Sequence, residues 1–237
     1  MAKRILITGS DGRFAKILKK SFFGKKIYYR NKKQLNILNY KKIEKFLKKY
    51  KIDIVIHLAA ISRPMAIHEK KISQSILVNI IGTSNIVMAC EKNKAKLIYF
   101  STNYVYPGKK GNYKEKDPLL PVNNYAWSKL GGESAVQMYK KSLILRLSMT
   151  EYPFIHKKAF SNIKTSFMYQ TDVAKILPRL IHYNGIINIG GKGQSPYQFA
   201  KKDVKNIKKN LFNIKKSKVF MPKNSSMNLT KIKKFLN

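Results

Sequence analysis

The apolar residues of this chain fall into two patterns that alternate along it. Short runs rich in isoleucine, leucine and valine predict strands that are buried on both faces. Between these runs, apolar residues recur every three or four positions, which predicts amphipathic helices. The expected strands cover residues 4–8, 26–29, 53–58, 96–101, 142–147 and 186–189, and the expected helices between them cover residues 13–21, 40–50, 73–91 and 123–139.

This alternation predicts an α/β fold with a doubly wound parallel sheet of the Rossmann type. Right-handed crossovers bring the carboxyl ends of the strands to one edge of the sheet. Residues just after Thr8, Leu58 and Ser101 should therefore face one cleft. We expect residues 1–148 to form a dinucleotide-binding core that carries the catalytic residues, with residues 149–237 as a small C-terminal substrate lobe intertwined with that core.

The pattern is weaker in the last third of the chain. Residues 149–170 have no firm period, whereas helices are expected over residues 171–182 and 195–211. A glycine-rich segment, residues 190–193, precedes Pro196. We interpret this segment as a turn, with phosphate binding as the alternative.

A glycine-rich turn joins the first strand to the first helix and reads Thr8-Gly9-Ser10-Asp11-Gly12-Arg13-Phe14-Ala15. Gly9 can make the tight turn, Gly12 lets the backbone approach a pyrophosphate, and the small Ala15 permits close packing of the helix on the strand. Backbone N–H groups at a helix N-terminus also attract phosphate. The turn therefore predicts a dinucleotide site, with contacts from Gly9, Ser10, Asp11, Gly12, Arg13 and Phe14.

The end of the second strand normally distinguishes NAD from NADP. A carboxylate there binds the ribose 2′-hydroxyl, whereas a cation tolerates a 2′-phosphate. This strand ends in Tyr28-Tyr29-Arg30-Asn31, without an acid. Arg30, joined by Arg13, therefore favours NADP, with NAD still open. The alternative is that either arginine is an ordinary solvated charge in a very basic chain.

Tyr125 and Lys129 lie four residues apart in an expected helix, so both side chains fall on one face. A nearby ammonium favours the phenolate and would bring the phenol from its usual pKa of about 10 toward a range useful for proton exchange. A hydroxyl from Thr102 or Ser101 could hold the same substrate oxygen. This set predicts reduction of a carbonyl, with hydride from a nicotinamide and the proton from Tyr125. The alternative is a chance spacing on an ordinary surface helix.

Several motifs occur in the order that one known family has. They are the glycine turn, His57-Leu58-Ala59-Ala60, Asn79 with Gly82-Thr83-Ser84-Asn85, Ser101-Thr102-Asn103-Tyr104-Val105-Tyr106-Pro107-Gly108, Pro121 before Tyr125 and Lys129, Thr171-Asp172-Val173-Ala174, and Pro222-Lys223-Asn224-Ser225-Ser226-Met227-Asn228-Leu229. With them the chain resembles the extended short-chain dehydrogenase/reductase family over nearly its whole length. Within that family it is most similar to the dTDP-4-dehydrorhamnose reductase-like branch.

The resemblance implies a catalytic set of Thr102, Tyr125 and Lys129. It also implies that Lys129 holds the nicotinamide ribose, that Ala59 and Ala60 line the cofactor cleft, and that Asn79 supports the site from the adjoining helix. The alternatives are that Ala59 and Ala60 are simply small residues at a strand end. Asn79 could likewise be a satisfied polar residue of its helix.

The function that the resemblance implies is reduction of a nucleotide-linked 4-keto-6-deoxy sugar with NADP, in polysaccharide biosynthesis. The alternatives are an epimerase that retains its cofactor and a non-catalytic, cofactor-binding regulatory subunit. Two features depart from the branch. It usually has aspartate where this chain has Asn103, which removes a possible acid and argues against dehydratase chemistry. The stretch between Arg146 and Asp172 is short, which leaves the substrate least determined.

The net charge of +38 by itself suggests a nucleic-acid or membrane surface. The excess is almost all lysine and is spread over every expected helix, so we interpret it as compositional bias and expect no specific nucleic-acid or membrane partner. Cys90, the only cysteine, is expected to be buried. A cytoplasmic location is expected, because no signal-peptide pattern and no run of about 18 uncharged apolar residues is found. We expect no metal site, and a homodimer stays open.

Overall fold

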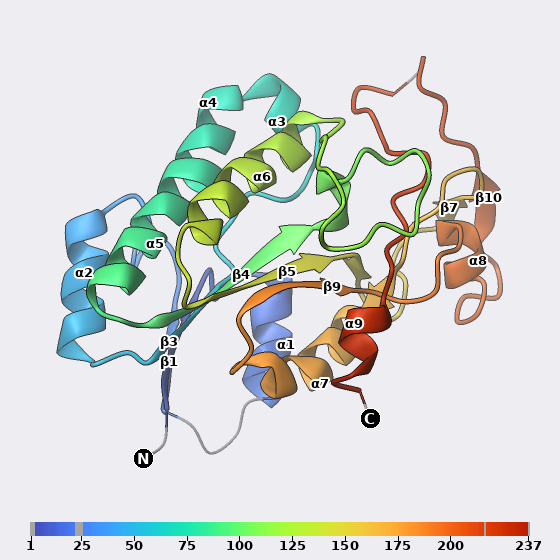
Figure 1. The fold of residues 1–237 in the computed structure, drawn as a ribbon. Helices are drawn as coiled ribbons and strands as arrows, with labels where there is room; N and C mark the ends of the chain where they lie inside the picture. The colour runs from blue at the N-terminus through green and yellow to red at the C-terminus, as the bar shows by residue number, and fades with distance from the viewer. Residues whose placement is uncertain (1–2, 22–25, 216, 237) are drawn as a thin grey trace.

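The computed structural model describes residues 3–21, 26–215 and 217–236 (Figure 1). Six described strands form one parallel sheet in the order β2-β1-β3-β4-β5-β9. These strands are β1 (Arg4–Thr8), β2 (Lys26–Arg30), β3 (Ile54–His57), β4 (Lys96–Thr102), β5 (Ser142–Leu147) and β9 (Gly185–Ile189). The expected strands and the doubly wound parallel sheet are confirmed.

Helices cover both faces of this sheet (Figure 1). One layer contains α1 (Arg13–Ser21), α7 (Gln170–Leu180) and α9 (Thr230–Lys233), and the other contains α2 (Tyr40–Lys49), α5 (Gly82–Lys92) and α6 (Asn124–Gln137). Because both faces are covered, β4 and β5 are buried along their whole length. The strand order changes direction at β1, so the crevice between β1 and β3 is where such sheets bind ligands.

Side-chain caps fix where two of these helices begin. The Asn39 side chain accepts a hydrogen bond from the Lys42 N–H at 3.0 Å, at the start of α2. The Asn123 side chain accepts one from the Ala126 N–H at 2.9 Å, at the start of α6. Such caps satisfy backbone donors that have no partner within the helix. The second cap places Tyr125 in the first turn of α6.

The helix expected over residues 73–91 is continuous but changes its geometry along its length. It consists of α4 (Ile72–Ser75), a π-helical segment η1 (Ile76–Ile81) and α5. By length and composition, it is the one helix of the described chain that could span a membrane. Its most apolar window has a mean hydropathy of 1.4, and 33% of that window is buried. The sequence reading did not single out this segment, because polar residues interrupt its apolar run. It packs beside α2 and α6 as part of one helical layer.

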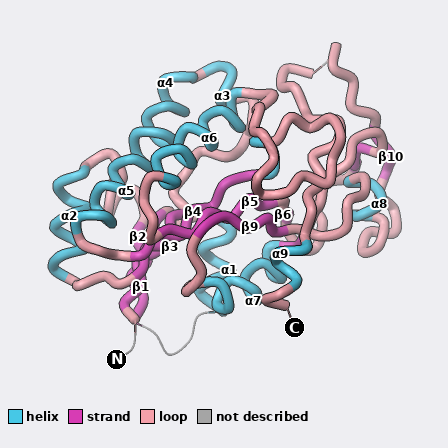
Figure 2. The backbone as a smooth tube through the Cα atoms, in the orientation of Figure 1, coloured by secondary structure: helices cyan, strands magenta, loops and turns pink. Residues whose placement is uncertain are grey.

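The chain after Ser148 contributes both to the main sheet and to a smaller lobe (Figure 2). The lobe contains β6 (Met149–Thr150) paired with β8 (Met168–Tyr169), β7 (Lys158–Phe160) paired with β10 (Lys208–Asn210), and α8 (Pro196–Ala200). Phe154, Ala159, Phe199 and Ile207 form its own small core. The division of the chain into two domains at residue 148 stays a prediction, since α7, β9 and α9 return to the main layers.

The prediction of a helix over residues 195–211 is wrong. α8 begins with a capping box, in which Ser195 and Gln198 exchange hydrogen bonds, but it ends at Ala200. Residues 201–206 carry no buried side chain, so a longer helix would have no apolar face to bury. The glycine-rich residues 190–193 form a loop, as interpreted from the sequence. A Cβ at Gly190 would lie 2.3 Å from the Ser166 carbonyl oxygen.

Candidate active site

Four hollows follow one another along the carboxyl edge of the sheet. From β2 toward the lobe, their volumes are about 330, 180, 190 and 370 Å³. Neighbouring hollows share wall residues: Gly9 and Gly12 for the first and second, Tyr125 and Gln170 for the second and third, Tyr104 and Phe167 for the third and fourth. The hollows therefore form one continuous cleft, and the glycine turn and the expected catalytic residues lie on it together.

The glycine turn allows a close approach of the backbone. Gly9 has a φ of +68°, and a Cβ at this position would lie 2.7 Å from backbone atoms of Ala59. The Gly12 N–H donates to the Gly9 carbonyl at 3.0 Å, and the Ser10 N–H donates to the Arg30 carbonyl at 3.2 Å. These bonds hold the turn at the N-terminus of α1. A diphosphate fits here, because no side chain stands between the backbone and the cleft at either glycine.

His57 fixes the end of β3 under the cleft. Its Nδ1 lies 2.8 Å from Thr8 Oγ1, and its Nε2 lies 3.1 Å from Thr83 Oγ1. Burial lowers the pKa of His57 to about 3, and the charge of Lys129 adds to this effect, so the ring is neutral. On this support, Ala59 and Ala60 line the first hollow, at the place that the family resemblance implied.

The Arg30 side chain contacts two aromatic rings and a backbone carbonyl. Its guanidinium lies 5.8 Å from the ring centre of Tyr28 and 5.1 Å from that of Phe46, and it donates to the Tyr29 carbonyl at 2.8 Å. Among the described residues that line the first hollow, the cation that follows β2 is Lys32. Sequence reasoning missed Lys32, and a role for Arg30 in cofactor selection stays a prediction.

The other residues of the turn have different surroundings. Asp11 lines the first hollow and accepts a hydrogen bond from Asn31 Nδ2 at 3.3 Å. Ser10 and Phe14 are buried, and the rings of Phe14 and Phe100 have centroids 5.3 Å apart. Phe14 therefore supports the second hollow mainly as a core residue.

Two hydroxyls at the end of β4 have different partners. Ser101 Oγ donates to a Glu133 carboxylate oxygen at 2.5 Å. Thr102 Oγ1 accepts a hydrogen bond from the Tyr104 N–H at 3.3 Å and caps the short helix η2 (Asn103–Val105). It also lines the third hollow with Tyr125 and acts to lower the pKa of that phenol. Of the two candidates, Thr102 is thus the hydroxyl paired with Tyr125.

Asn103 has a structural role that an aspartate could not fill. Its buried amide nitrogen donates to Thr165 Oγ1 at 3.0 Å, to the Ser225 carbonyl at 3.1 Å and to Ser225 Oγ at 2.9 Å. A carboxylate has no hydrogen to donate to the carbonyl. The amide therefore fastens the end of β4 to the lobe and to the closing segment of the chain, which explains this departure from the related branch.

The pKa of Tyr125 differs from the sequence expectation. Burial raises it above its ordinary value, while the hydrogen bond with Thr102 and the charge of Arg63 act in the opposite direction with smaller effect. The expected lowering by Lys129 is not found, because burial lowers the pKa of Lys129 to about 7, and its ammonium loses its charge before the phenol titrates. Tyr125 therefore keeps its proton at neutral pH.

Lys129 and Glu133 follow Tyr125 at successive turns of α6. Burial lowers the pKa of Lys129 to about 7, and the charge of Glu133 opposes this shift. Glu133 is itself buried in an ion pair with Arg146 of β5, at 2.6 Å. This pair anchors the catalytic face of α6 to the sheet. Sequence reasoning missed it, although a charged residue inside an apolar strand was an available signal.

Glu151, just after β6, lies between two arginines. It forms ion pairs with Arg13 and Arg63, the latter at 2.9 Å. Burial opposes ionisation of this carboxyl, but a backbone hydrogen bond and the charges of Arg63 and Arg13 hold its pKa below the usual range. Both arginine side chains remain 50% and 41% exposed, and both line the third hollow. No local sequence signal indicated this cluster.

Both polar atoms of the Asn79 side chain form hydrogen bonds within the protein. Its Oδ1 accepts from the Ile61 N–H at 2.8 Å, and its Nδ2 donates to the Ile61 carbonyl at 2.9 Å and to Ser128 Oγ at 2.8 Å. Ser128 Oγ in turn donates to the Tyr125 carbonyl at 2.7 Å. Asn79 thus ties the loop after β3 to α6, which agrees with a supporting role. A direct cofactor contact stays a prediction.

His68 lies behind Tyr125 and was not expected from the sequence. It belongs to α3 (Ile67–Lys70) and is fully buried, with its ring centre 5.2 Å from that of Tyr125. Its Nδ1 lies 2.8 Å from Ser75 Oγ, while its Nε2 has no hydrogen-bond partner among the described residues. Burial is the main reason that its pKa is lowered, so a neutral ring packs against the phenol.

Residues 3–160 match the family model described as the RmlD substrate binding domain. A dTDP-4-dehydrorhamnose reductase of Aggregatibacter actinomycetemcomitans is 30% identical over 152 residues, which cover 62% of this chain and 51% of that protein. The methionine adenosyltransferase 2 subunit beta of Pongo abelii is 28% identical over 143 residues, which cover 56% of this chain and 42% of that protein. The chain thus spans about half the length of the curated relatives that it matches.

Solved structures agree with this assignment. A dTDP-4-dehydrorhamnose reductase from Bacillus anthracis in complex with NADP has a TM-score of 0.87 and 26% identity, over 98% of this chain and 91% of that chain. The family model covers more than half of the chain, and the fold agrees over nearly all of it. The chain therefore belongs to the RmlD substrate-binding domain family, within the sugar-nucleotide reductase branch of the extended short-chain dehydrogenase/reductases.

Proposed function

We propose that this protein is an NADP-dependent oxidoreductase that reduces a nucleotide-linked 4-keto-6-deoxy sugar. The observation that carries this proposal is the continuous cleft on which Thr102, Tyr125 and Lys129 meet the glycine turn. Support for the substrate class comes from the similarity to a dTDP-4-dehydrorhamnose reductase, and support for the cofactor comes from a similar structure crystallised with NADP.

The cofactor would occupy the first and second hollows. The backbone of Gly9 and Gly12 would meet its diphosphate, Lys32 its 2′-phosphate, and Lys129 its nicotinamide ribose. Bound there in its reduced form, it supplies the hydride that the substrate carbonyl carbon receives. The remaining chemistry falls to side chains of this chain.

Tyr125 donates the proton that converts the carbonyl oxygen to a hydroxyl. Because burial keeps the pKa of this phenol high, it is protonated before the reaction. The Thr102 hydroxyl, which lines the third hollow with Tyr125, holds the same substrate oxygen. The positive charge of Arg63 favours the phenolate that proton transfer leaves behind.

The fourth hollow has the chemistry that a nucleoside diphosphate requires. It combines cationic or imidazole side chains with aromatic rings, and these residues are Arg63, His156, Lys158, Lys164, Tyr104, Phe154, Phe160 and Phe167. Cations can bind the diphosphate, and rings can stack on the base. Arg63 and Tyr104 also line the third hollow, so a sugar attached to that diphosphate would reach Tyr125.

The test is turnover by the purified chain with NADPH and a panel of dTDP- and GDP-linked 4-keto-6-deoxy sugars. We expect loss of the absorbance of the reduced cofactor with at least one sugar, and no loss with the corresponding 4-hydroxy sugar. NADPH binding without turnover on any member of the panel would refute the proposed activity.

A non-catalytic, cofactor-binding subunit is the second candidate. It is favoured by the similarity to methionine adenosyltransferase 2 subunit beta and by the small lobe. In that case NADPH would bind with no turnover, and Tyr125→Phe would leave the cellular function intact. An epimerase would instead retain its nucleotide through purification and interconvert two sugars without net oxidation of cofactor.

A further inference from the structure

The amino edge of the sheet, opposite the cleft, carries a separate hollow of about 570 Å³. Its wall is made where β1, β3 and β4 begin and where α2 and α5 end. The charged residues of this wall are Lys3, Arg4, Lys48, Lys51, Asp53, Lys94, Lys96 and Lys141. Asp53 is the one carboxylate among the described wall residues; it accepts a hydrogen bond from the Arg4 N–H at 2.8 Å and forms an ion pair with the Arg4 guanidinium at 3.7 Å. We call this feature the amino-edge hollow.

Two of these cations are held in place by neutral groups. Lys96, the first residue of β4, is buried, and its ammonium donates to the Tyr183 carbonyl at 2.7 Å and to the side chain of Asn184. The Lys141 ammonium donates to the Lys94 carbonyl at 2.5 Å. Burial and the nearby charge of Lys141 lower the pKa of Lys96 to about 8. The amino-edge hollow therefore concentrates the positive charge of six lysines, none of which forms an ion pair with a described carboxylate, since Asp53 pairs with Arg4.

Two further cations occupy backbone positions that do not favour lysine. Lys51 has a φ of 46° and Lys94 a φ of 55°, and they follow the ends of α2 and α5. Glycine or asparagine is preferred at such left-handed positions after a helix. Neither ammonium has a hydrogen-bond or ion-pair partner within the described ranges. At both places the chain has a strained backbone residue whose charge lines the same hollow.

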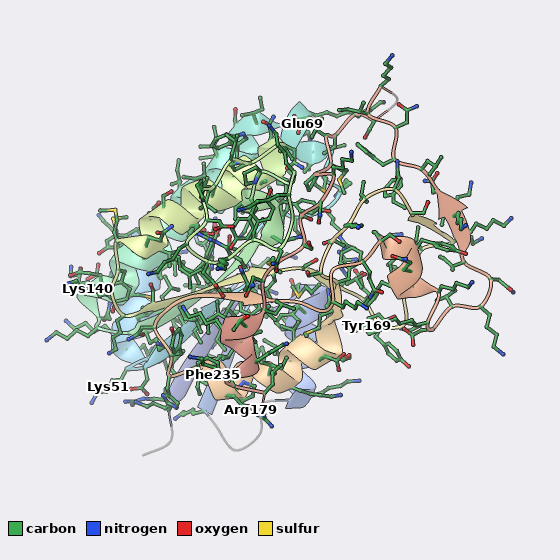
Figure 3. The ribbon with its side chains drawn as sticks, turned by 45° about the vertical axis from the view of Figure 1, so that its right-hand side comes forward. Lys51, Glu69, Lys140, Tyr169, Arg179 and Phe235 are labelled. Carbon is green, nitrogen blue, oxygen red and sulfur yellow. The ribbon has the colours of Figure 1, made fainter. Side chains whose placement is uncertain are left out.

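We propose that the amino-edge hollow binds a small molecule with two or more adjacent phosphate groups, such as an oligophosphate chain. Closely spaced phosphates would place several negative charges among ammonium groups for which the described residues provide no anionic partner. The volume of the hollow lies within the range of about 300–1,000 Å³ typical of small-molecule sites. None of its described wall residues lines the four hollows of the proposed reductase cleft, and Figure 3 shows Lys51 at the end of the molecule away from Tyr169 of the lobe.

Calorimetric titration of the full chain with tripolyphosphate, at a salt concentration of about 0.15 M, tests the proposal. The site variant is Lys51→Asn with Lys94→Asn. The control is Lys202→Asn with Lys205→Asn, which removes the same charge from exposed residues of the lobe. We expect saturable binding of tripolyphosphate by the unchanged chain and by the control, and affinity weakened by about tenfold or more in the site variant. Reductase turnover, measured in parallel, should be the same in all three.

Three outcomes would overturn the proposal. One is that tripolyphosphate shows no saturable binding. Another is that both double variants weaken binding equally, which would assign the effect to net charge alone. The third is that a short RNA duplex binds the unchanged chain but not the site variant, and that tripolyphosphate does not displace this RNA. In that case a nucleic-acid backbone would be the occupant. Because asparagine suits a left-handed backbone, the site variant is expected to fold, and its unfolding transition checks this.

Discussion

Charged side chains at the two edges of the sheet have different kinds of partner. At the carboxyl edge, the buried Glu133 is paired with Arg146, and Glu151 is held between two arginines. At the amino edge, the ammonium groups of Lys96 and Lys141 contact carbonyl or amide oxygens and lie close enough to repel each other. These ion pairs join different elements at the carboxyl edge, which supports the positions of the neutral Tyr125 phenol and Thr102 hydroxyl. At the amino edge Asp53 pairs with Arg4, and the lysines that pair with no described carboxylate instead suit an external anion.

Removing the phenol hydroxyl should give the largest change at the carboxyl edge. Tyr125→Phe is expected to lower kcat by roughly 10²–10⁴-fold, because the proton donor is lost while the cofactor-binding backbone is untouched. Stopped-flow or steady-state oxidation of NADPH measures the rate, and fluorescence titration measures cofactor affinity. Tyr197→Phe is the matched control, since its ring lies in the lobe beside Lys209. A rate that survives in Tyr125→Phe would show that another group donates the proton.

Replacing the amide of Asn103 should destabilise the protein at the same edge. Asn103→Asp would leave the Ser225 carbonyl without its donor and would bury a carboxylate. The expected loss of unfolding free energy is about 1–3 kcal/mol or more. Urea denaturation measures it, with Asn213→Asp as the control. Among the described residues, that exposed side chain only accepts a hydrogen bond, from the Lys215 N–H. Equal stability of the two variants would contradict the fastening role of Asn103.

The lowered pKa of Lys129 should set a pH limit on reduction. A buried lysine with a pKa of about 7 loses its charge as the pH rises through that value, whereas Tyr125, with a raised pKa, stays protonated. If the cation assists cofactor binding and proton transfer, kcat/KM should fall by up to about tenfold per pH unit above 7. Measurement from pH 5.5 to about 9 gives the profile, and Lys129→Met should flatten it at a lower level. A kcat/KM that does not change with pH in the unchanged chain would contradict this role of Lys129.

The smallest expected effect is a change in stability from single substitutions at the amino edge, measured without any ligand. Lys51→Asn and Lys94→Asn should each raise the unfolding free energy by about 0.5–1 kcal/mol, because asparagine tolerates a positive φ better than lysine. Lys202→Asn and Lys205→Asn, at surface positions, should stay within about 0.5 kcal/mol. Thermal and urea unfolding compare the four variants. If all four change stability alike, the gain comes from lower net charge and not from backbone strain.

Local sequence patterns predicted much of the fold, and long-range contacts explain what was missed. The strands followed from their apolar runs, and α6 followed from its helical period. The helix expected after Ser195 failed, because period alone does not reveal whether a face finds something to cover it. The same limit applies to the lobe, whose short strands pair with partners distant along the chain.

Within the site, the sequence by itself determined the groups that act locally. The glycine turn is contiguous, and Tyr125 and Lys129 share a helical face through a spacing of four. The tertiary structure decided everything that depends on distant partners. Arg63 meets Glu151 across 88 residues, and burial lowers the pKa of Lys129 so that its charge is lost before Tyr125 titrates. Charge pairing and burial arise only when packed elements meet, and no spacing along one helix or strand encodes them.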